Sequence, residues 1–420
     1  MNFIIRKIKE FELISIIYIM TLRASMLAGK FLLGLFIVRF LGLDTMGVYG
    51  LLLGIAAIFP MIARLGIFSS ISRIAVGQPI SLLTKNLYHY ASGTLVIYAV
   101  LLPAIIILGV HFETPKLFIL GFFVILFEHI SADIFVLTNN LEKPKLANEL
   151  LSLQSAVWIY LYIFSALLFP ALRTLDNILL FWISGGILSC LIAIYAARNW
   201  PWKETLREKI NLTWYKEHLH GAWRLYFGDI INALSIYLDR YLITWILGLE
   251  AAGIYVLFWQ VTNAICNLVG ASVLYPYRPR LIGAFKERNI ELFNSLFRES
   301  ASKSLILGGI MACVSAAIIP ALIRYTNNAE ALRHLSLFWF MLFAMMVRIC
   351  YDICAYTMYA RQNDALAMRN GLLKIFMTSI LGWVILSIAG LHGAPVTTIM
   401  SEAAAIIVTF FIWTKKRDVK

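Results

Sequence analysis

Twelve long apolar segments dominate this 420-residue chain and constrain its fold more than any other feature. A helix needs roughly 20 mostly apolar residues to cross the hydrocarbon core of a bilayer. Soluble proteins average about 45–50% apolar and about 25% charged residues, whereas this chain has 61% and 14%. The sequence therefore predicts an all-α integral membrane protein with twelve transmembrane helices, near 12–40, 47–68, 88–110, 117–138, 151–169, 176–197, 222–247, 252–275, 304–325, 334–360, 371–390 and 394–414.

The basic residues predict which ends of these helices face the cytoplasm. Of the 36 Lys and Arg residues, 24 fall on the side that includes both termini and four on the other side. Cytoplasmic segments of membrane proteins carry such an excess, so both termini are predicted to be cytoplasmic. The net charge of +13 then reflects membrane topology and not nucleic-acid binding. The N-terminal apolar segment lacks a small-residue cleavage site and is expected to be a retained span.

A nine-residue motif occurs twice, 206 positions apart, as LGLDTMGVY (41–49) and LGLEAAGIY (247–255). Each copy joins two apolar segments on the same side of the membrane. Six spans separate the copies and preserve direction, so we expect two parallel repeats. The predicted parts are an N-terminal six-helix lobe (1–200), a cytoplasmic linker (201–221) and a C-terminal six-helix lobe (222–420).

Two glycines in each copy predict a hinge between helices. Gly42 and Gly248 are expected to end a helix in the left-handed conformation that other residues resist. Gly47 and Gly253 are expected to open the next helix at a point where backbones approach closely.

Fourteen charged residues lie within the predicted spans. Each costs roughly 2.5–3.5 kcal/mol near the bilayer centre unless it meets water or a partner. The N-terminal lobe holds four basic against two acidic residues, net +2, and the C-terminal lobe four of each, net zero. They are Arg23, Lys30, Arg39, Arg64, Arg224, Arg240, Arg348, Lys374, Glu128, Asp133, Asp229, Asp239, Asp352 and Glu402.

Some of these charges have local explanations. Arg348 and Asp352 are four residues apart on one predicted helix, which is the spacing of a local ion pair. The adjacent residues Asp239 and Arg240 point about 100° apart on a helix, so they are not expected to neutralise each other.

Three basic residues of the first two spans have no acid near them in the sequence. Arg23 and Lys30 are seven residues apart, so they share a helix face and lie about 10 Å apart along the axis. Arg64 in the second span also has no local acid. Unbalanced positive charge on the N-terminal wall predicts an anionic ligand, and Arg and Lys are the residues that bind phosphate.

The chain resembles bacterial polysaccharide flippases of the Wzx type, within the multidrug/oligosaccharidyl-lipid/polysaccharide exporter superfamily. The two glycine motifs, YLDRYLITWILG (237–248) and GLHGAPVTTIMSEAAAII (390–407) carry the resemblance. It implies two six-helix bundles forming a V that opens alternately to either side. It also implies transport of undecaprenyl-pyrophosphate-linked oligosaccharide, such as an O-antigen unit, across the bacterial inner membrane. The partners implied are this lipid-linked substrate, a polysaccharide polymerase and a chain-length regulator.

The resemblance also implies roles for the charges inside the membrane. Its substrate-binding candidates line the lumen and meet a diphosphate or acidic sugar; they are Arg23, Lys30, Arg64, Arg240 and Lys374. For the acids, coupling to a proton or sodium gradient and a structural partnership both stay open; these acids are Asp133, Asp229, Asp239, Asp352 and Glu402.

Other functions have weaker support in the sequence. A multidrug or cation exporter of the same superfamily is expected to concentrate acids in its N-terminal lobe. A membrane glycosyltransferase or polymerase usually has long outer loops, and none here exceeds about 12 residues. No phosphate-binding G-x-x-x-x-G-K-[ST] loop is present, so we do not expect ATP to drive this protein directly. We expect the protein to be a transporter and not an enzyme, with no cofactor and no bound metal. His129 is expected to bind an ion or to be a satisfied core histidine.

Overall fold

The computed structural model describes residues 2–74, 78–361 and 363–417, with side chains for 17–72, 78–220, 226–361, 363 and 365–413. Within these residues every regular element is a helix and none is a strand. Eleven stretches are long and apolar enough to cross a membrane. One of them, Ala365–Trp413, contains two helices separated by a 3-10 turn at Gly390–His392. The described chain thus makes twelve passes, and the predicted all-α membrane fold is confirmed.

The helices follow one another with short connections. Those of the first half are α1 (Asn2–Phe40), α2 (Leu43–Ala63), α3 (Ile67–Ile74), α4 (Ile80–His111), α5 (Pro115–Asn140), α6 (Pro144–Ser152), α7 (Trp158–Leu168), α8 (Leu175–Ala196) and α9 (Trp202–Thr205). Those of the second half are α10 (Leu212–Leu247), α11 (Leu249–Val269), α12 (Tyr275–Lys286), α13 (Ile290–Tyr325), α14 (Ala329–Arg333), α15 (Leu335–Ala360), α16 (Asp364–Ala389) and α17 (Gly393–Arg417). The π-helical turns η1 (Leu153–Val157) and η3 (Gly270–Leu274) join α6 to α7 and α11 to α12.

Contacts between Cα atoms divide the chain into two compact units. Unit 1 comprises Met1–Leu33 and Ile55–Ile230, and unit 2 comprises Gly34–Gly54 and Ile231–Lys420. The boundaries cross α1, α2 and α10 inside the helices. The hairpin 34–54 therefore goes with the second half of the chain, and 201–230 goes with the first. These bounds differ from the predicted lobes, whose limits stay a prediction.

Unit 1 is organised around α5, which packs against α4, α6 and α8. The small residues of α8 make its close contacts possible. A Cβ added to Gly186 would lie 2.6 Å from Cβ of Phe127 on α5. A Cβ on Gly185 would lie 2.7 Å from Cδ1 of Trp158. The sequence SGGI (184–187) thus allows α8 to approach α5 and α7 without a gap.

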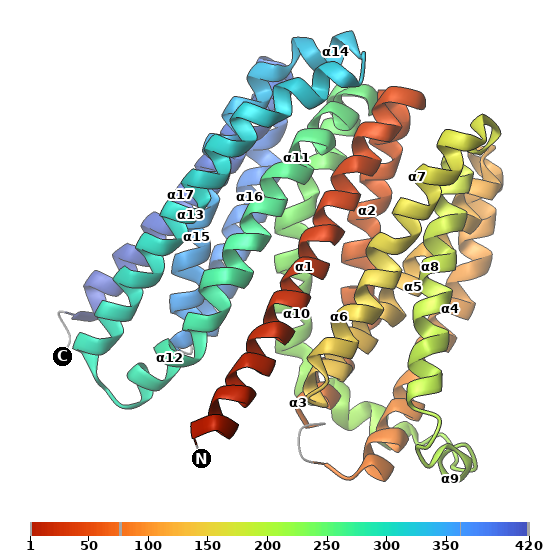
Figure 1. Cartoon of the computed structure of the whole chain (residues 1–420), viewed down its shortest axis with the longest axis vertical. Helices are drawn as coiled ribbons and strands as arrows, with labels where there is room; N and C mark the ends of the chain where they lie inside the picture. Colours follow the sequence, from red (N-terminus) through yellow and green to blue (C-terminus); the bar gives the residue numbers. More distant parts are fainter. Residues whose placement is uncertain (1, 75–77, 362, 418–420) are drawn as a thin grey trace. The chain divides into compact units, whose positions relative to one another are not determined.

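Helix α11 of unit 2 begins inside the second motif and is deeply buried. Every residue of α11 from Ala252 to Thr262 is buried, as expected of a helix surrounded by protein on all sides. The helix packs against α13 and α15, while α16 and α17 form an antiparallel hairpin (Figure 1). That hairpin turns at Gly390, whose φ of +59° lies in the region that glycine tolerates best.

The two copies of the nine-residue motif pack against each other in unit 2. Gly42 and Gly248 end their helices with φ of +92° and +89°, which confirms the predicted positive-φ turns. A Cβ on Gly47 would collide with the backbone of Leu249, and a Cβ on Gly253 with the backbone of Leu43. The two contacts are equivalent, because Leu249 and Gly253 occupy the same motif positions as Leu43 and Gly47, 206 residues earlier. The repeat therefore generates a reciprocal backbone contact between α2 and α11, related by a local two-fold axis.

Candidate functional site

Arg64, the residue that follows α2, is the centre of a buried polar cluster in unit 1. Its Nε atom lies 2.6 Å from Oδ1 of Asp133 on α5, and the two side chains are only 10% and 12% exposed. The other oxygen of Asp133 accepts a 2.6 Å hydrogen bond from the hydroxyl of Tyr90 on α4. No acid is close to Arg64 in the sequence, but the fold brings Asp133, 69 positions away, into contact with it. The expectation that its charge is unbalanced is therefore wrong.

His129 of α5 completes this cluster and is fully buried. The hydroxyl of Tyr90 lies 2.8 Å from its Nε2 atom, and that of Tyr98 lies 3.1 Å from Nδ1. Because Tyr90 donates its proton to Asp133, its oxygen is available to accept a hydrogen bond from Nε2–H of His129. Both ring nitrogens of His129 thus have hydrogen-bonding partners, and Nε2 also lies 3.2 Å from Oδ2 of Asp133, which is the arrangement of a satisfied core histidine.

Arg23 and Lys30 extend from α1 towards other helices of unit 1. Nε of Arg23 donates to Oδ1 of the buried Asn148 on α6 at 3.0 Å. Lys30 lies close enough to Glu128 on α5 for the two charges to interact. Among the described residues, none accepts a hydrogen bond from the Nη groups of Arg23 or from Nζ of Lys30. Both half-buried cations therefore keep donors for an anion.

Glu128 has neutral partners that the sequence analysis did not single out. It accepts a 2.7 Å hydrogen bond from Nε1 of Trp182 on α8 and another from Nε2 of Gln154. Gln154 lies in the π-helical turn η1, and such turns occur often at functional sites. Asn148, Gln154 and Trp182 carry no charge, so only their polarity inside an apolar span signalled a role.

Arg240 of α10 is completely buried in unit 2. Its Cζ atom lies 4.2 Å from the ring centre of Trp259 and 4.6 Å from that of Tyr237. Nη1 donates to the carbonyl oxygen of Gly50 at 3.3 Å, and Nε lies 3.8 Å from Oδ1 of Asp239. The prediction that Asp239 and Arg240 do not neutralise each other is wrong, because Oδ1 of Asp239 accepts a 2.7 Å hydrogen bond from the backbone N–H of Arg240 and thereby lies within ion-pair distance of the guanidinium.

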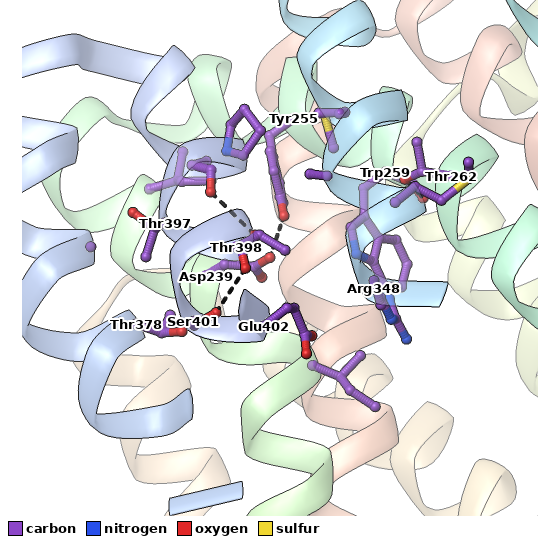
Figure 2. A pocket seen from close by; sticks show the side chains of 18 of the residues that line it. Asp239, Tyr255, Trp259, Thr262, Arg348, Thr378, Thr397, Thr398, Ser401 and Glu402 are labelled. Atoms are coloured by element: carbon purple, nitrogen blue, oxygen red, sulfur yellow. Dashed lines mark hydrogen bonds between the residues drawn. The ribbon is translucent and has the colours of Figure 1, made fainter. Parts of the chain in front are cut away.

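A polar cavity of about 60 Å³ lies among α10, α11, α15, α16 and α17 of unit 2 (Figure 2). Asp239 and Glu402 both line it, together with Arg348, and Tyr255 donates a hydrogen bond to Asp239. One water needs about 10–15 Å³ of such volume. The cavity therefore has room for several waters, or for a cation and part of its hydration shell. Its hydroxyl groups belong to Thr262, Thr378, Thr397, Thr398 and Ser401.

Glu402 also forms a buried ion pair with Lys374 of α16. Nζ of Lys374 lies 2.8 Å from Oε1 of Glu402, and the two side chains are 8% and 5% exposed. Within the described residues, the second carboxylate oxygen of Glu402 has no hydrogen-bond partner. A cation in the cavity would find this oxygen available.

Arg348 and Asp352 do not make the contact that their spacing predicts. Arg348 reaches across to α11 and donates from Nη1 to Oδ1 of Asn263 at 3.3 Å. Its charge still acts on Asp352, but no ion pair within 4.0 Å joins these two described residues. The long side chain of Arg348 makes a hydrogen bond to the neighbouring helix instead of an ion pair with Asp352 on its own helix.

The two compact units divide the remaining charges differently from the predicted lobes. Arg39 belongs to unit 2, where Nη1 donates to the carbonyl oxygen of Tyr325 at 2.8 Å. Asp229 is exposed and belongs to unit 1, where Ser69 donates to it at 3.4 Å. The side chain of Arg224 lies outside the described residues. Counted by unit, each has four basic against three acidic residues, net +1, in place of the predicted +2 and zero.

Comparison with known proteins identifies the family. The chain matches the family described as polysaccharide biosynthesis protein over residues 14–282. No curated protein sequence matches it. Within the described part, no group of three His, Cys, Asp or Glu side chains is placed to hold a metal ion.

Three solved structures illustrate the fold. The lipid II flippase MurJ, in an inward closed conformation, aligns with a TM-score of 0.74 at 12% identity, covering 96% of this chain and 87% of that one. An inward-facing multidrug resistance MATE family transporter of the MOP superfamily gives 0.70 at 13% identity, with 96% and 97% covered. A MOP superfamily transporter from Pyrococcus furiosus, described by the reverse polarity of its binding pocket, gives 0.57 at 14% identity, with 95% of each covered. The chain therefore belongs to the polysaccharide biosynthesis protein family and has the fold of the MOP-superfamily transporters.

Proposed function

We propose that this multi-pass membrane protein moves an undecaprenyl-pyrophosphate-linked oligosaccharide from the cytoplasmic to the outer leaflet of a bacterial inner membrane. The family match supports polysaccharide biosynthesis, and the fold is similar to that of a lipid flippase and of a multidrug resistance transporter. The sugar head is too polar to cross hydrocarbon, so the protein provides a hydrated path while the prenyl tail stays in lipid. A polymerase and a chain-length regulator would act on the delivered substrate.

Arg23 and Lys30 carry this proposal. They lie on one face of α1, and each keeps hydrogen-bond donors that the described residues leave free. Arg23 matches a phosphate oxygen pair through its planar guanidinium, and Lys30 acts as a point charge. Arg64 is neutralised by Asp133, and Arg240 is fully buried. We therefore assign these two a positioning role, and Arg23 and Lys30 the contact with the diphosphate.

The variant Arg23→Gln/Lys30→Gln tests this assignment. Each lost charge-assisted hydrogen bond is worth about 1.5–3 kcal/mol, and 1.4 kcal/mol corresponds to tenfold. We expect at least a tenfold loss of lipid-linked oligosaccharide transfer across the bilayer of proteoliposomes, measured by accessibility of the sugar to an external glycosidase. Lys116→Gln is the matched control, because Lys116 is an exposed cation of unit 1 that pairs with Asp176. Unchanged transfer in the double variant contradicts the assignment.

An ion gradient supplies the energy for this cycle in our proposal, and the cavity of unit 2 is the coupling site. Asp239 and Glu402 bring two carboxylates to one small polar cavity, with hydroxyl groups around them. Oxygen ligands of this kind suit a hard cation. Asp133 is held by Arg64 and Tyr90, and Asp352 does not line the cavity. These two acids then serve as structural partners.

Asp239→Asn is expected to abolish the dependence of transfer on an imposed ion gradient. The amide keeps the size of the side chain and still accepts a hydrogen bond from Tyr255. The measurement compares the initial rate of transfer in proteoliposomes with and without a sodium or proton gradient. The parallel variant Asp352→Asn should retain the acceleration. If both variants respond to the gradient like the unmodified protein, the coupling site lies elsewhere.

A multidrug or cation exporter is the second candidate, and one observation favours it. Counted by compact unit, the membrane-embedded residues have a net charge of +1 in each, so unit 1 has no excess of positive charge over unit 2. The fold is also that of a MATE transporter. Efflux of organic cations from proteoliposomes, in a preparation that does not transfer lipid-linked oligosaccharide, would establish this function in place of the first.

A further inference from the structure

Unit 1 contains a second cavity, much larger than the polar one and separate from Arg23 and Lys30. Its volume is about 530 Å³, within the range of about 300–1,000 Å³ typical of ligand pockets. Its walls come from α4, α5, α8 and the segment that follows α8, including Trp200, Trp202 and Leu206. A hydrogen bond of 3.2 Å between Thr205 and Thr84 holds this segment against α4.

The lining of this cavity is almost entirely hydrocarbon. Its aliphatic side chains come from all the contributing helices, and stacked Trp200 and Trp202 belong to it. The polar side chains of one wall, Tyr90, Tyr98, His129 and Asp133, are already hydrogen-bonded to one another. Water would therefore find few partners inside. The chemistry of the lining matches an apolar chain.

The cavity is open on the side of the unit that faces lipid. Leu95 of α4 and Ile194 of α8 line it, yet 70% and 67% of their surfaces are exposed. Residues this apolar and this exposed in membrane-spanning helices lie against lipid chains. An unfilled space of this size would forfeit the dispersion contacts of its walls. A chain from the bilayer can enter and fill it.

Lys143 adds a positive charge to this apolar cavity. It lines the cavity, is exposed and makes no ion pair or hydrogen bond through its ammonium group with the described residues. It precedes Pro144, the first residue of α6, so the partial positive charge of a helix N-terminus adds to its own. The adjacent acid, Glu142, does not line the cavity. A hydrocarbon-lined cavity with one free cation is complementary to a lipid with an anionic head group.

We propose that this cavity binds an acyl chain of an anionic phospholipid, whose phosphate lies beside Lys143. A phospholipid fits better than the tail of the transported substrate. Lys143 is the cation that the described lining offers, one for one phosphodiester, and four of the polar side chains are already hydrogen-bonded to one another, so little is left to hold a diphosphate or a sugar. The bound lipid would fill the space between α4 and α8 and support the segment that closes the cavity. This site is independent of the substrate assigned above.

Native mass spectrometry of the full-length protein in detergent micelles tests the site. Phosphatidylglycerol and phosphatidylcholine with identical acyl chains are titrated separately, and the dissociation constant of the first bound lipid is measured. We expect the protein to prefer phosphatidylglycerol. Lys143→Gln should weaken phosphatidylglycerol binding about fivefold, the effect of one basic residue at an anionic surface, and leave phosphatidylcholine unchanged.

Two further variants keep the test specific. Lys145→Gln removes the same charge two residues away. Because Lys145 lies outside the cavity and interacts with Glu149 and Tyr18, this variant should bind phosphatidylglycerol like the unmodified protein. Ala193→Trp places an indole in the cavity and should eliminate the first phosphatidylglycerol while the protein still elutes as a folded species.

Three results would overturn the proposal. The first is equal affinity of the unmodified protein for the two phospholipids. The second is equal affinity of Lys143→Gln and Lys145→Gln for phosphatidylglycerol. The third is displacement of phosphatidylglycerol by an equimolar amount of undecaprenyl phosphate from the unmodified protein, which would assign the cavity to the prenyl chain of the substrate.

Discussion

Gly253→Ala is expected to shift the conformational equilibrium of the protein and to reduce transfer at least about fivefold. A Cβ at this position collides with the backbone of Leu43, and a backbone cannot yield as a side-chain tip can. Overpacking of this kind costs about 1–3 kcal/mol, which corresponds to a change of about 5–150-fold in an equilibrium constant. Our proposal of an alternating-access cycle includes a state in which the two motifs of unit 2 separate and a state in which they meet. The substitution penalises only the state in which they meet.

The accessibility of a cysteine at position 256 reports this shift directly. Val256 is completely buried and packs where a Cβ of Gly50 would lie. In a Val256→Cys background from which the five native cysteines have been removed, a membrane-impermeant maleimide should react at least about fivefold faster after Gly253→Ala. Gly309→Ala is the control, because no atom lies within 4 Å of its added Cβ. Equal labelling rates in the two alanine variants would show that the contact does not separate during the cycle.

Asp133→Leu is expected to lower the free energy of unfolding by about 3–5 kcal/mol, because it leaves the buried guanidinium of Arg64 without its counter-ion. Arg64 has one further buried nitrogen, Nη2, with no hydrogen-bond partner among the described residues, so the unit has no spare acceptor for it. Tyr90 and His129 also lose the carboxylate that orders their hydrogen bonds. Unfolding by sodium dodecyl sulfate in mixed micelles measures the loss.

The double variant Arg64→Leu/Asp133→Leu distinguishes an unpaired charge from lost packing. Replacing both members of a buried pair by apolar residues is often neutral or stabilising, so it should recover most of the stability that Asp133→Leu loses. Lys116 and Asp176 form the control pair, 2.7 Å apart but 70% and 36% exposed. Removing that pair should cost less than about 1 kcal/mol. A double variant as unstable as Asp133→Leu alone would rule out charge pairing as the cause.

The glycine motif is the part of the structure that local sequence explains best. Positive φ at Gly42 and Gly248 follows from the absence of a Cβ, and the close approach at Gly47 and Gly253 follows from the same property. The identity of the contact partner was not available from either copy alone. Each copy predicts a compact hairpin, and only the tertiary structure shows that the hairpins bind each other.

The charged residues show where the sequence was insufficient. Asp133 neutralises Arg64, and Glu402 neutralises Lys374, across 69 and 28 positions of sequence. No helical periodicity relates such residues. The local spacings misled in both directions: Arg348 and Asp352 do not touch at four residues apart, and the adjacent residues Asp239 and Arg240 do. Spacing along one helix does not predict these ion pairs, because long side chains also reach neighbouring helices, and the packing of the helices determines which charged groups are close in space.

The sequence by itself determined the membrane fold, the number of passes and the doubled hinge, because burial in hydrocarbon requires long apolar helices and tight turns require glycine. The tertiary structure alone decided which charges are neutralised, since a low-dielectric interior pairs residues by proximity in space. It left Arg23 and Lys30 with free donors, joined Asp239 to Glu402 in one cavity, and placed Lys143 at a hydrocarbon-lined cavity.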